Sequence, residues 1–122
     1  MTRILLLLLL LGGRIPAAYT QTNAKAQIQY LIRAVAESGC EFDRNGKLYP
    51  ADKAAEHLEL KYSRGKRYAD SPEAFIEYLA SNSSWTGEPC LMICGGQVTP
   101  AGEWLMTKLE AMREIYWLRE NL

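Results

Sequence analysis

Residues 40–50 read CEFDRNGKLYP, and this stretch decides the fold that the rest of the chain must accommodate. Asn45-Gly46 is the pair favoured in a two-residue type I′ turn, because both central residues of that turn need a positive φ. Phe42 precedes the turn and Tyr49 follows it. The stretch therefore predicts a short β-hairpin over Glu41 to Tyr49.

Helices are predicted on both sides of this hairpin. Residues 24–38 carry apolar side chains at helical spacing, and Gly39 follows as a C-terminal stop. A second helix is predicted from Pro50 through residue 63, ending by Gly65, because proline fits the first helical position. The apolar residues that face the core in these two helices are expected to be Ile28, Leu31, Ile32, Val35, Ala54, Ala55, Leu58 and Tyr62.

Two more helices and a strand are predicted in the second half. Residues 70–73 start a helix with two candidate N-caps. One is Ser71, which precedes a proline, and the other is Asp70, which has Glu73 three residues later as in a capping box. The run PCLMICGG at residues 89–96 is typical of a buried strand, and Gln97-Val98 is expected to pair briefly with it. Thr99-Pro100 is expected to start the last helix, as N-cap and first helical residue, with its core face formed by Ala101, Leu105, Leu109, Met112 and Tyr116.

These elements predict an α+β fold. We expect a small antiparallel sheet, made of the hairpin plus one or two short strands, packed with about four helices. About 100 residues suffice for one such domain with one modest core. We therefore assign residues 24–122 to a single α+β domain.

The N-terminus has the layout of a secretory signal peptide. Arg3 precedes an apolar run of eight residues, Ile4 to Leu11, which glycines and a proline then interrupt. The run is too short for a permanent membrane span, which needs about 20 apolar residues. We expect residues 1–20 to be the leader and the mature domain to be periplasmic or secreted. An uncleaved anchor is the alternative, because Arg14 lies late and no clean A-x-A site follows.

The charge and the motifs of the mature chain exclude several partners. Removing the leader leaves 12 basic and 14 acidic side chains, a net charge of about minus two, whereas nucleic-acid-binding domains usually have a basic excess. We expect no nucleic-acid partner, no cofactor and no stable membrane span after cleavage. Zinc is also not expected, because three cysteines and the distant His57 lack the paired spacing of a structural site.

The three cysteines predict one disulfide and one free thiol in an exported protein. Cys90 and Cys94 are four residues apart, which is roughly 13 Å in an extended segment and too far for a disulfide. Cys40 is therefore expected to pair with one of them. If the strand pairs with the hairpin, Cys40 at the hairpin's entrance meets Cys94 at the strand's exit.

Residues 80–90, ASNSSWTGEPC, form a hydroxyl-rich segment that we call the hydroxyl loop. Three interpretations are open. Ser, Asn and Thr side chains compete for backbone groups, so the loop is a natural helix terminus. Alternatively its hydroxyls bond the hairpin and lock sheet to helix. The third interpretation is the rim of a polar ligand site, formed by Ser83, Ser84, Trp85, Thr86 and Gly87.

The only concentrated basic and aromatic segment runs from the second helix into the connection after it. It consists of His57, Lys61, Arg64, Lys66 and Arg67, with Tyr62 and Tyr68. These side chains predict a patch for a phosphate, a carboxylated glycan or an acidic protein in the cell envelope. The competing view is a solvated surface neutralised by Glu59 and Asp70. We favour a non-enzymatic binding module whose ligand or protein partner is unknown.

The alternative function is a small hydrolase. Ser83 or Ser84 would be the nucleophile, His57 the base, and an acid would orient the base. No nucleophile elbow frames either serine, and the chain has one histidine in total. We therefore assign no catalytic residue.

Taken together, three motifs resemble the YfeK-like family of small exported bacterial proteins, a domain of unknown function. They are R-N-G at residues 44–46, H-L-x-x-K at residues 57–61 and S-S-x-[ST]-G-x-P at residues 83–89, within a resemblance that spans residues 28–113. Thr86 stands where serine is common in the family. Cys90 stands where relatives tend to carry an aromatic residue, so the resemblance implies that Cys90 is unpaired and that Cys40 is bonded to Cys94. The resemblance implies a fold and an exported location, but it implies no activity.

Overall fold

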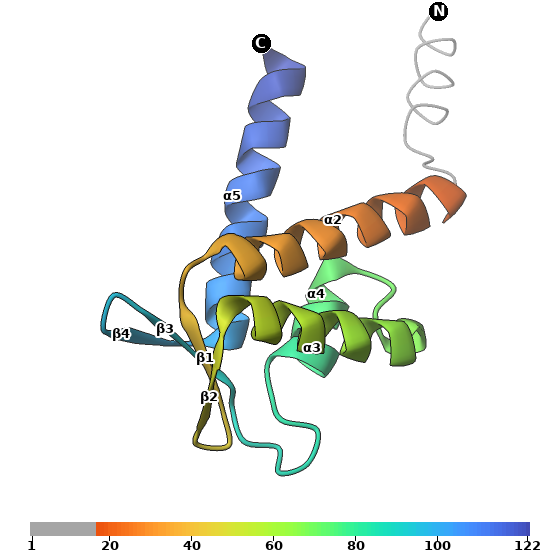
Figure 1. Ribbon diagram of the computed structural model, residues 1–122. Coiled ribbons are helices and arrows are strands. Elements are labelled where there is room, and N and C mark those ends of the chain that lie inside the picture. The colour runs from red at the N-terminus through yellow and green to blue at the C-terminus, as the bar shows by residue number, and fades with distance from the viewer. Residues whose placement is uncertain (1–16) are drawn as a thin grey trace, which may run out of the picture.

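The computed structural model describes residues 17–122, with side chains from residue 23 onward. Most of the predicted leader lies outside this range. The chain forms an α+β domain in which helices cover one side of a four-stranded antiparallel sheet of order β2-β1-β3-β4 (Figure 1). In the described residues no helix is long and apolar enough to cross a membrane.

The predicted first hairpin is confirmed. Strands β1 (Glu41–Arg44) and β2 (Lys47–Pro50) pair antiparallel around Asn45 and Gly46, whose φ angles are 56° and 81°. Both positive values are those that a type I′ turn requires. Asp43 Oδ1 also accepts the Gly46 N–H at 2.8 Å, so the turn is held by a side chain as well as by its backbone.

A second hairpin, β3 (Leu91–Cys94) with β4 (Gln97–Pro100), turns at Gly95-Gly96. The predicted strand and its pairing are confirmed, although β4 is longer than the two residues expected. Strand β1 pairs with β3, so that Phe42 lies opposite Met92 in the middle of the sheet. Both side chains are buried, and they join the two hairpins through one core.

The two hairpins and the helices that follow them are structural repeats. Helix α3 (Ala51–Arg64) follows β2 and α5 (Ala101–Asn121) follows β4, and each element of the second unit begins 50 residues after its counterpart. The register between β1 and β3 is symmetric about the Phe42–Met92 pair. The sheet therefore has a local two-fold axis at its centre.

Each of these helices begins one residue later than predicted. Pro50 and Pro100 are the last residues of their strands and occupy the N-cap positions, without a side-chain cap. Each proline still pairs across the sheet, Pro50 with Glu41 and Pro100 with Leu91, and this pairing keeps the backbone extended. The proposed Thr99 cap is therefore wrong.

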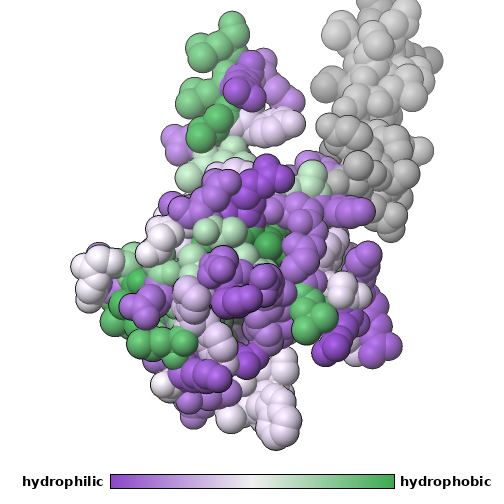
Figure 2. All heavy atoms as spheres, in the orientation of Figure 1, coloured by the Kyte–Doolittle hydropathy of each residue, from purple (hydrophilic) through white to green (hydrophobic). Residues whose placement is uncertain are grey.

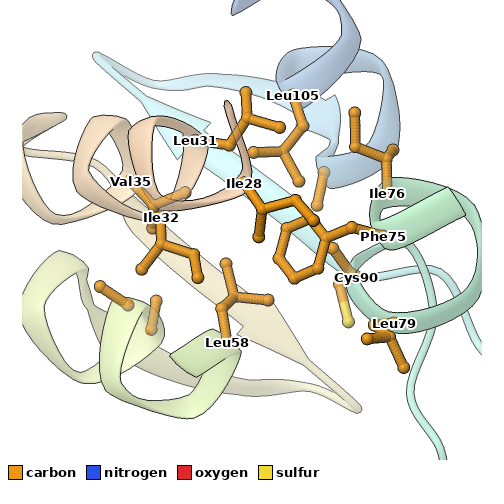
Figure 3. Close-up of a cluster of buried hydrophobic side chains, with 14 of the residues drawn as sticks. Ile28, Leu31, Ile32, Val35, Leu58, Phe75, Ile76, Leu79, Cys90 and Leu105 are labelled. Atoms are coloured by element: carbon orange, nitrogen blue, oxygen red, sulfur yellow. The ribbon is translucent and has the colours of Figure 1, made fainter. Parts of the chain in front are cut away.

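Helix α2 (Ala17–Glu37) lies across the helical layer and contacts α3 and α5. It begins earlier than predicted and ends near Gly39, whose φ of 68° is the left-handed stop expected there. Figure 3 shows its side chains pointing toward Leu58 of α3, toward Leu105 of α5 and toward Phe75, which precedes the sheet's second hairpin in the chain. All of the predicted core residues of α2 and α3 are buried.

The third helix divides into α4 (Pro72–Ala74) and a wider π-type turn, η2 (Phe75–Ala80). Ser71 is the N-cap, and its Oγ accepts the Ala74 N–H at 3.0 Å, which decides between the two candidates. A short 3-10 turn, η1 (Lys66–Tyr68), connects this helix to α3.

The last helix departs from prediction at its far end. Ala101, Leu105 and Leu109 are buried as expected, but Met112 is only half-buried and Tyr116 is 64% exposed. Figure 1 shows the reason, because α5 projects beyond the rest of the domain. The expectation that Tyr116 belongs to the core is therefore wrong.

Candidate functional site

A pocket of about 540 Å³ lies between the β1–β2 turn, helix α3 and the hydroxyl loop, and we call it the turn pocket. Three segments that are distant in sequence build it, since the loop follows the turn by about 40 residues. Its lining is formed by Arg44, Asn45, His57, Leu60, Lys61, Arg64, Gly65, Tyr68, Leu79, Ser83, Ser84 and Trp85.

Asn45 ties the turn to the hydroxyl loop. Its Nδ2 donates to Ser83 Oγ at 2.9 Å, and its Oδ1 accepts from Thr86 Oγ1 at 2.6 Å. Ser83 is buried, and its Oγ also accepts the Trp85 N–H at 3.2 Å. One asparagine in a left-handed turn position thus holds both ends of the loop's serine-to-threonine segment.

The rest of the loop is closed by backbone bonds. Gly87 N donates to Ser83 O at 2.9 Å, with Gly87 at a φ of 72°. Ser81 Oγ donates to Ile76 O at 2.6 Å and so ends the η2 turn. The hydroxyl loop therefore acts both as a helix terminus, through Ser81, and as a lock on the hairpin, through Ser83 and Thr86. A role as a ligand rim stays a prediction.

Arg44 and His57 form one wall of the turn pocket. Arg44 Nη1 lies 2.7 Å from His57 Nε2, and Arg44 Nη2 donates to the Tyr49 hydroxyl at 3.1 Å. Partial burial, together with the charges of Arg44 and Lys61, lowers the pKa of His57 below its usual 6.5. The imidazole is therefore neutral at pH 7 and accepts from the guanidinium, with its acceptor nitrogen already engaged.

Lys61 and Arg64 lie three residues apart on α3, which places them on the same face of the helix. Lys61 Nζ donates to the Asn82 carbonyl at 3.1 Å, so the lysine joins α3 to the hydroxyl loop. Burial, with the nearby Arg44 guanidinium, lowers the pKa of Lys61 from its usual value of about 10.5. A group whose charge is disfavoured in this way gains from a nearby anion.

No carboxylate lines the turn pocket, although three of its residues, Arg44, Lys61 and Arg64, are cationic. In the part of the chain that the structure describes, the ion pairs are Lys53–Glu56 and Arg113–Glu73, and neither lies in this pocket. Glu59, one of the two acids proposed to neutralise the segment, instead accepts from Gln29 of α2. The pocket is therefore a site of uncompensated positive charge.

Two aromatic rings stand at the rim. Trp85 is 95% exposed and Tyr68 is 51% exposed, and both line the pocket. Arg67 is not part of the lining, because its guanidinium stacks on the Tyr68 ring with 4.8 Å between Cζ and the ring centroid. An exposed indole beside fixed cations offers a flat apolar surface next to an anion site.

The structure brings together six of the nine predicted site residues, namely His57, Lys61, Arg64, Ser83, Ser84 and Trp85. Arg67 lies behind Tyr68, while Thr86 and Gly87 support the loop from outside the lining. Sequence reasoning missed Arg44 and Asn45 as site residues, whereas Tyr68 belonged to the predicted basic and aromatic segment and lines the pocket. The R-N-G motif at residues 44–46 predicted a hairpin turn, and nothing in the motif indicated that Arg44 and Asn45 also line a pocket.

The contacts of a hydrolase are not formed around His57. Ser83 Oγ accepts from Asn45 and from the Trp85 backbone, and His57 contacts Arg44 rather than a serine. In the described chain no side-chain hydrogen bond joins His57 to a carboxylate. Nor does any cluster of three metal-ligating side chains occur within residues 17–122.

The predicted disulfide is present. Cys40 is bonded to Cys94, and Cys90 is free and buried. Burial raises the pKa of the Cys90 thiol, although the charges of Lys61 and Arg44 act in the opposite direction. The free cysteine is therefore a protonated core side chain at neutral pH.

The fold and the site define a small disulfide-bonded α+β domain with a cationic surface pocket. The chain belongs to a family of unknown function, DUF5329, whose model matches residues 22–113. It is 36% identical over 75 residues to the uncharacterised protein YfeK of Salmonella typhimurium. That match covers 59% of this chain and 62% of YfeK, so the chain spans less than two thirds of this relative. No solved structure matches the chain.

Proposed function

We propose that this protein is a non-enzymatic binding module of the bacterial cell envelope that holds an anionic ligand in the turn pocket. The observation that carries the proposal is a pocket with three cationic side chains, Arg44, Lys61 and Arg64, and no carboxylate. Hydrogen bonds between a cation and a carboxylate or phosphate are about twice as strong as neutral ones. Arg64 and Lys61 are the residues best placed to make them.

The rim favours an anion that carries a ring. Trp85 and Tyr68 expose their faces beside the basic floor, and such faces stack on sugar or aromatic rings. A phosphate ester, a carboxylated glycan and an acidic protein segment share this chemistry. The pocket is open, as suits a ligand that extends beyond it.

Two features support a location in the cell envelope, outside the cytosol. The leader pattern at residues 1–20 and the disulfide between Cys40 and Cys94 are both typical of proteins outside the reducing cytosol. Cleavage after Ala18 or Thr20 would remove no more than the first turn of α2. Mass spectrometry of the N-terminus from an envelope fraction tests this, and an intact Met1 contradicts cleavage.

A matched pair of sugars tests the ligand class. N-acetylmuramic acid differs from N-acetylglucosamine by a lactyl group that carries a carboxylate, so their comparison isolates the charge. We expect the acid to bind and the neutral sugar not to bind in calorimetric titrations of the purified oxidised protein. Titrations with inorganic phosphate and with a short poly-glutamate peptide test the other two ligand classes, a phosphate ester and an acidic protein segment.

Two charge reversals locate the binding site. Arg64→Glu is expected to weaken anion binding at least about tenfold, because hydrogen bonds to charged groups contribute about 1.5–3 kcal/mol. Arg67→Glu is the matched control, since its charge lies outside the lining. If no anion of the set binds, or if both variants weaken binding equally, the turn pocket is not the site.

A further inference from the structure

A second pocket adjoins the turn pocket along helix α3, and we call it the Tyr49 pocket. It has a volume of about 510 Å³ and lies between α3 and the first hairpin. Arg44, His57 and Leu60 line both pockets. Arg44 Nη1 and His57 Nε2 are 2.7 Å apart, so this contact forms the wall at which the two pockets meet.

Both pockets follow one face of α3. The lining residues of this helix recur at spacings of three and four, which places them on the same face. They are Lys53, Glu56, His57, Leu60, Lys61 and Arg64. From the first to the last they cover about 16 Å at 1.5 Å per residue, and we call the two pockets together the α3 groove. Figure 2 shows mostly hydrophilic residues over α3 and the tip of the first hairpin, whereas hydrophobic residues gather over the β3–β4 hairpin.

The Tyr49 pocket contains a pair of like charges. Arg44 and Lys47 are direct partners across β1 and β2. Both lie over the Tyr49 ring, whose centroid is 5.2 Å from Arg44 Cζ and 5.4 Å from Lys47 Nζ. Like charges directly opposite one another destabilise a sheet. Within the described residues neither cation forms an ion pair, so an anion bound between them would relieve their repulsion.

The α3 groove as a whole has an excess of positive charge. Its cationic side chains are Arg44, Lys47, Lys53, Lys61 and Arg64, and its one carboxylate is that of Glu56. Glu56 pairs with Lys53 at 3.3 Å, so the other four cations have no carboxylate partner in the part of the chain that the structure describes. These four are distributed over both pockets. Such an arrangement fits a ligand whose acidic groups repeat along its length.

We propose that the α3 groove binds an acidic glycan chain, with one acidic sugar in the turn pocket and another in the Tyr49 pocket. This inference rests on the proposed function, which places the first anionic group in the turn pocket. Repeated acidic groups match the four unpaired cations, and sugar rings match the exposed faces of Trp85 and Tyr68 at the rim. A poly-glutamate segment carries the charges without rings. A nucleic acid carries both, but the mature chain lacks the basic excess of nucleic-acid-binding domains.

Calorimetric titrations of the oxidised protein with galacturonic acid and with its linear trimer test the second pocket. We expect the trimer to bind at least about tenfold more tightly than the monomer, because linked groups make the second contact intramolecular. The fully methyl-esterified trimer has the same rings without charge and is expected not to bind. Equal affinities of monomer and trimer overturn this inference and leave the single-anion site intact. If neither uronate nor N-acetylmuramic acid binds, the proposed function fails as well.

Lys47→Gln then separates the two pockets. It is expected to weaken trimer binding about twofold to fivefold, the range of an exposed ion pair, and to weaken galacturonic acid binding less. Arg64→Glu is expected to weaken both ligands. Lys25→Gln is the matched control, because Lys25 is exposed on α2 and lines neither pocket.

Two results of these titrations would overturn the assignment. If Lys47→Gln and Lys25→Gln have equal effects on the trimer, the Tyr49 pocket is not part of the site. If a short poly-glutamate or oligothymidylate of the same charge binds more tightly than the trimer, the ligand is not a glycan. Melting temperatures of the three variants confirm that each is folded.

Discussion

The two hairpin–helix units of this protein share a backbone but differ in what they carry. The first unit, residues 41–64, has a polar turn whose Asn45 bonds the hydroxyl loop, and its helix contributes His57, Lys61 and Arg64 to the turn pocket. The second unit, which begins at Leu91, turns at two glycines and has threonine, alanine and glutamate at the corresponding helix positions. A function proposed for one unit therefore depends on its side chains and not on the shared fold.

The cysteines break the same symmetry. Cys40 and Cys90 occupy equivalent positions, and so do Arg44 and Cys94. The disulfide Cys40–Cys94 on one side of the axis thus corresponds to the free Cys90 beside Arg44 on the other. One end of the sheet is closed by a covalent bond, while the other end carries the guanidinium that lines the turn pocket.

The largest effect is expected where the units are equivalent. Phe42→Ala and Met92→Ala each remove a fully buried side chain at the two-fold axis. We expect losses in the free energy of unfolding of about 3–5 and 2–5 kcal/mol, respectively, because each leaves a cavity in a shared core. Urea denaturation measures both. A loss below about 1 kcal/mol for either one would show that the units do not share the core equally.

Removing the disulfide tests one end of the sheet. The paired change Cys40→Ala with Cys94→Ala is expected to cost about 2–4 kcal/mol, because the bond closes a long loop in the unfolded chain. Cys90→Ala is the control in the equivalent position and is expected to cost about 1 kcal/mol. Equal losses in the two proteins would contradict a stabilising role for the disulfide.

The turns offer a sharper contrast. Asn45→Gly keeps a residue that tolerates positive φ but removes two side-chain hydrogen bonds, so a loss of about 1–2 kcal/mol is expected. Gly95→Asn is the reciprocal change, and Gly95 has open space around it at a φ of 57°. Asparagine tolerates that conformation, so thermal unfolding should move little. An unchanged melting temperature for Asn45→Gly would mean that the loop does not depend on the turn.

The smallest effect is the pH dependence of stability. Burial, Arg44 and Lys61 lower the pKa of His57 in the folded state below 6.5. The unfolded state therefore binds more protons at acidic pH, so this part of the stability is full above pH 6.5 and is lost as the pH falls toward the lower folded pKa.

Denaturation curves for His57→Gln between pH 8 and pH 5 check this expectation, since the variant should lose less stability over that interval than the parent. Thr107 occupies the equivalent place in the second unit. It does not titrate, so Thr107→Ala should leave the slope unchanged. Parallel curves for His57→Gln and the parent would contradict a lowered pKa.

Several elements followed from local sequence because local chemistry controls them. Asn45-Gly46 fixed the first turn, Gly39 ended α2, and Ser71 capped α4. The Cys40–Cys94 bond was expected from the family resemblance, whereas spacing alone left Cys90 as an alternative. Each local prediction needed only neighbours within a few residues.

The repeat escaped sequence reasoning because its two copies hardly resemble each other. Between residues 40–64 and 90–114 the identical positions are one cysteine, one glycine, one proline and one alanine. Burial also diverges along the helices, since α3 buries Leu58 and Tyr62 whereas α5 buries Leu109 and leaves Tyr116 in solvent. Periodicity predicted a longer core stripe on α5 because it carries no information about where the rest of the domain ends.

The sequence by itself determined the turns, the apolar faces of the first helices and the supply of basic and hydroxyl side chains. Only the tertiary structure decided that β1 pairs with β3, which places the β1–β2 turn within hydrogen-bonding reach of the hydroxyl loop. Turns and caps depend on neighbouring backbone angles, which a short stretch of chain specifies. A pocket built from β1, α3 and the loop depends instead on contacts between residues far apart in sequence, and these form only when the two units close on one core.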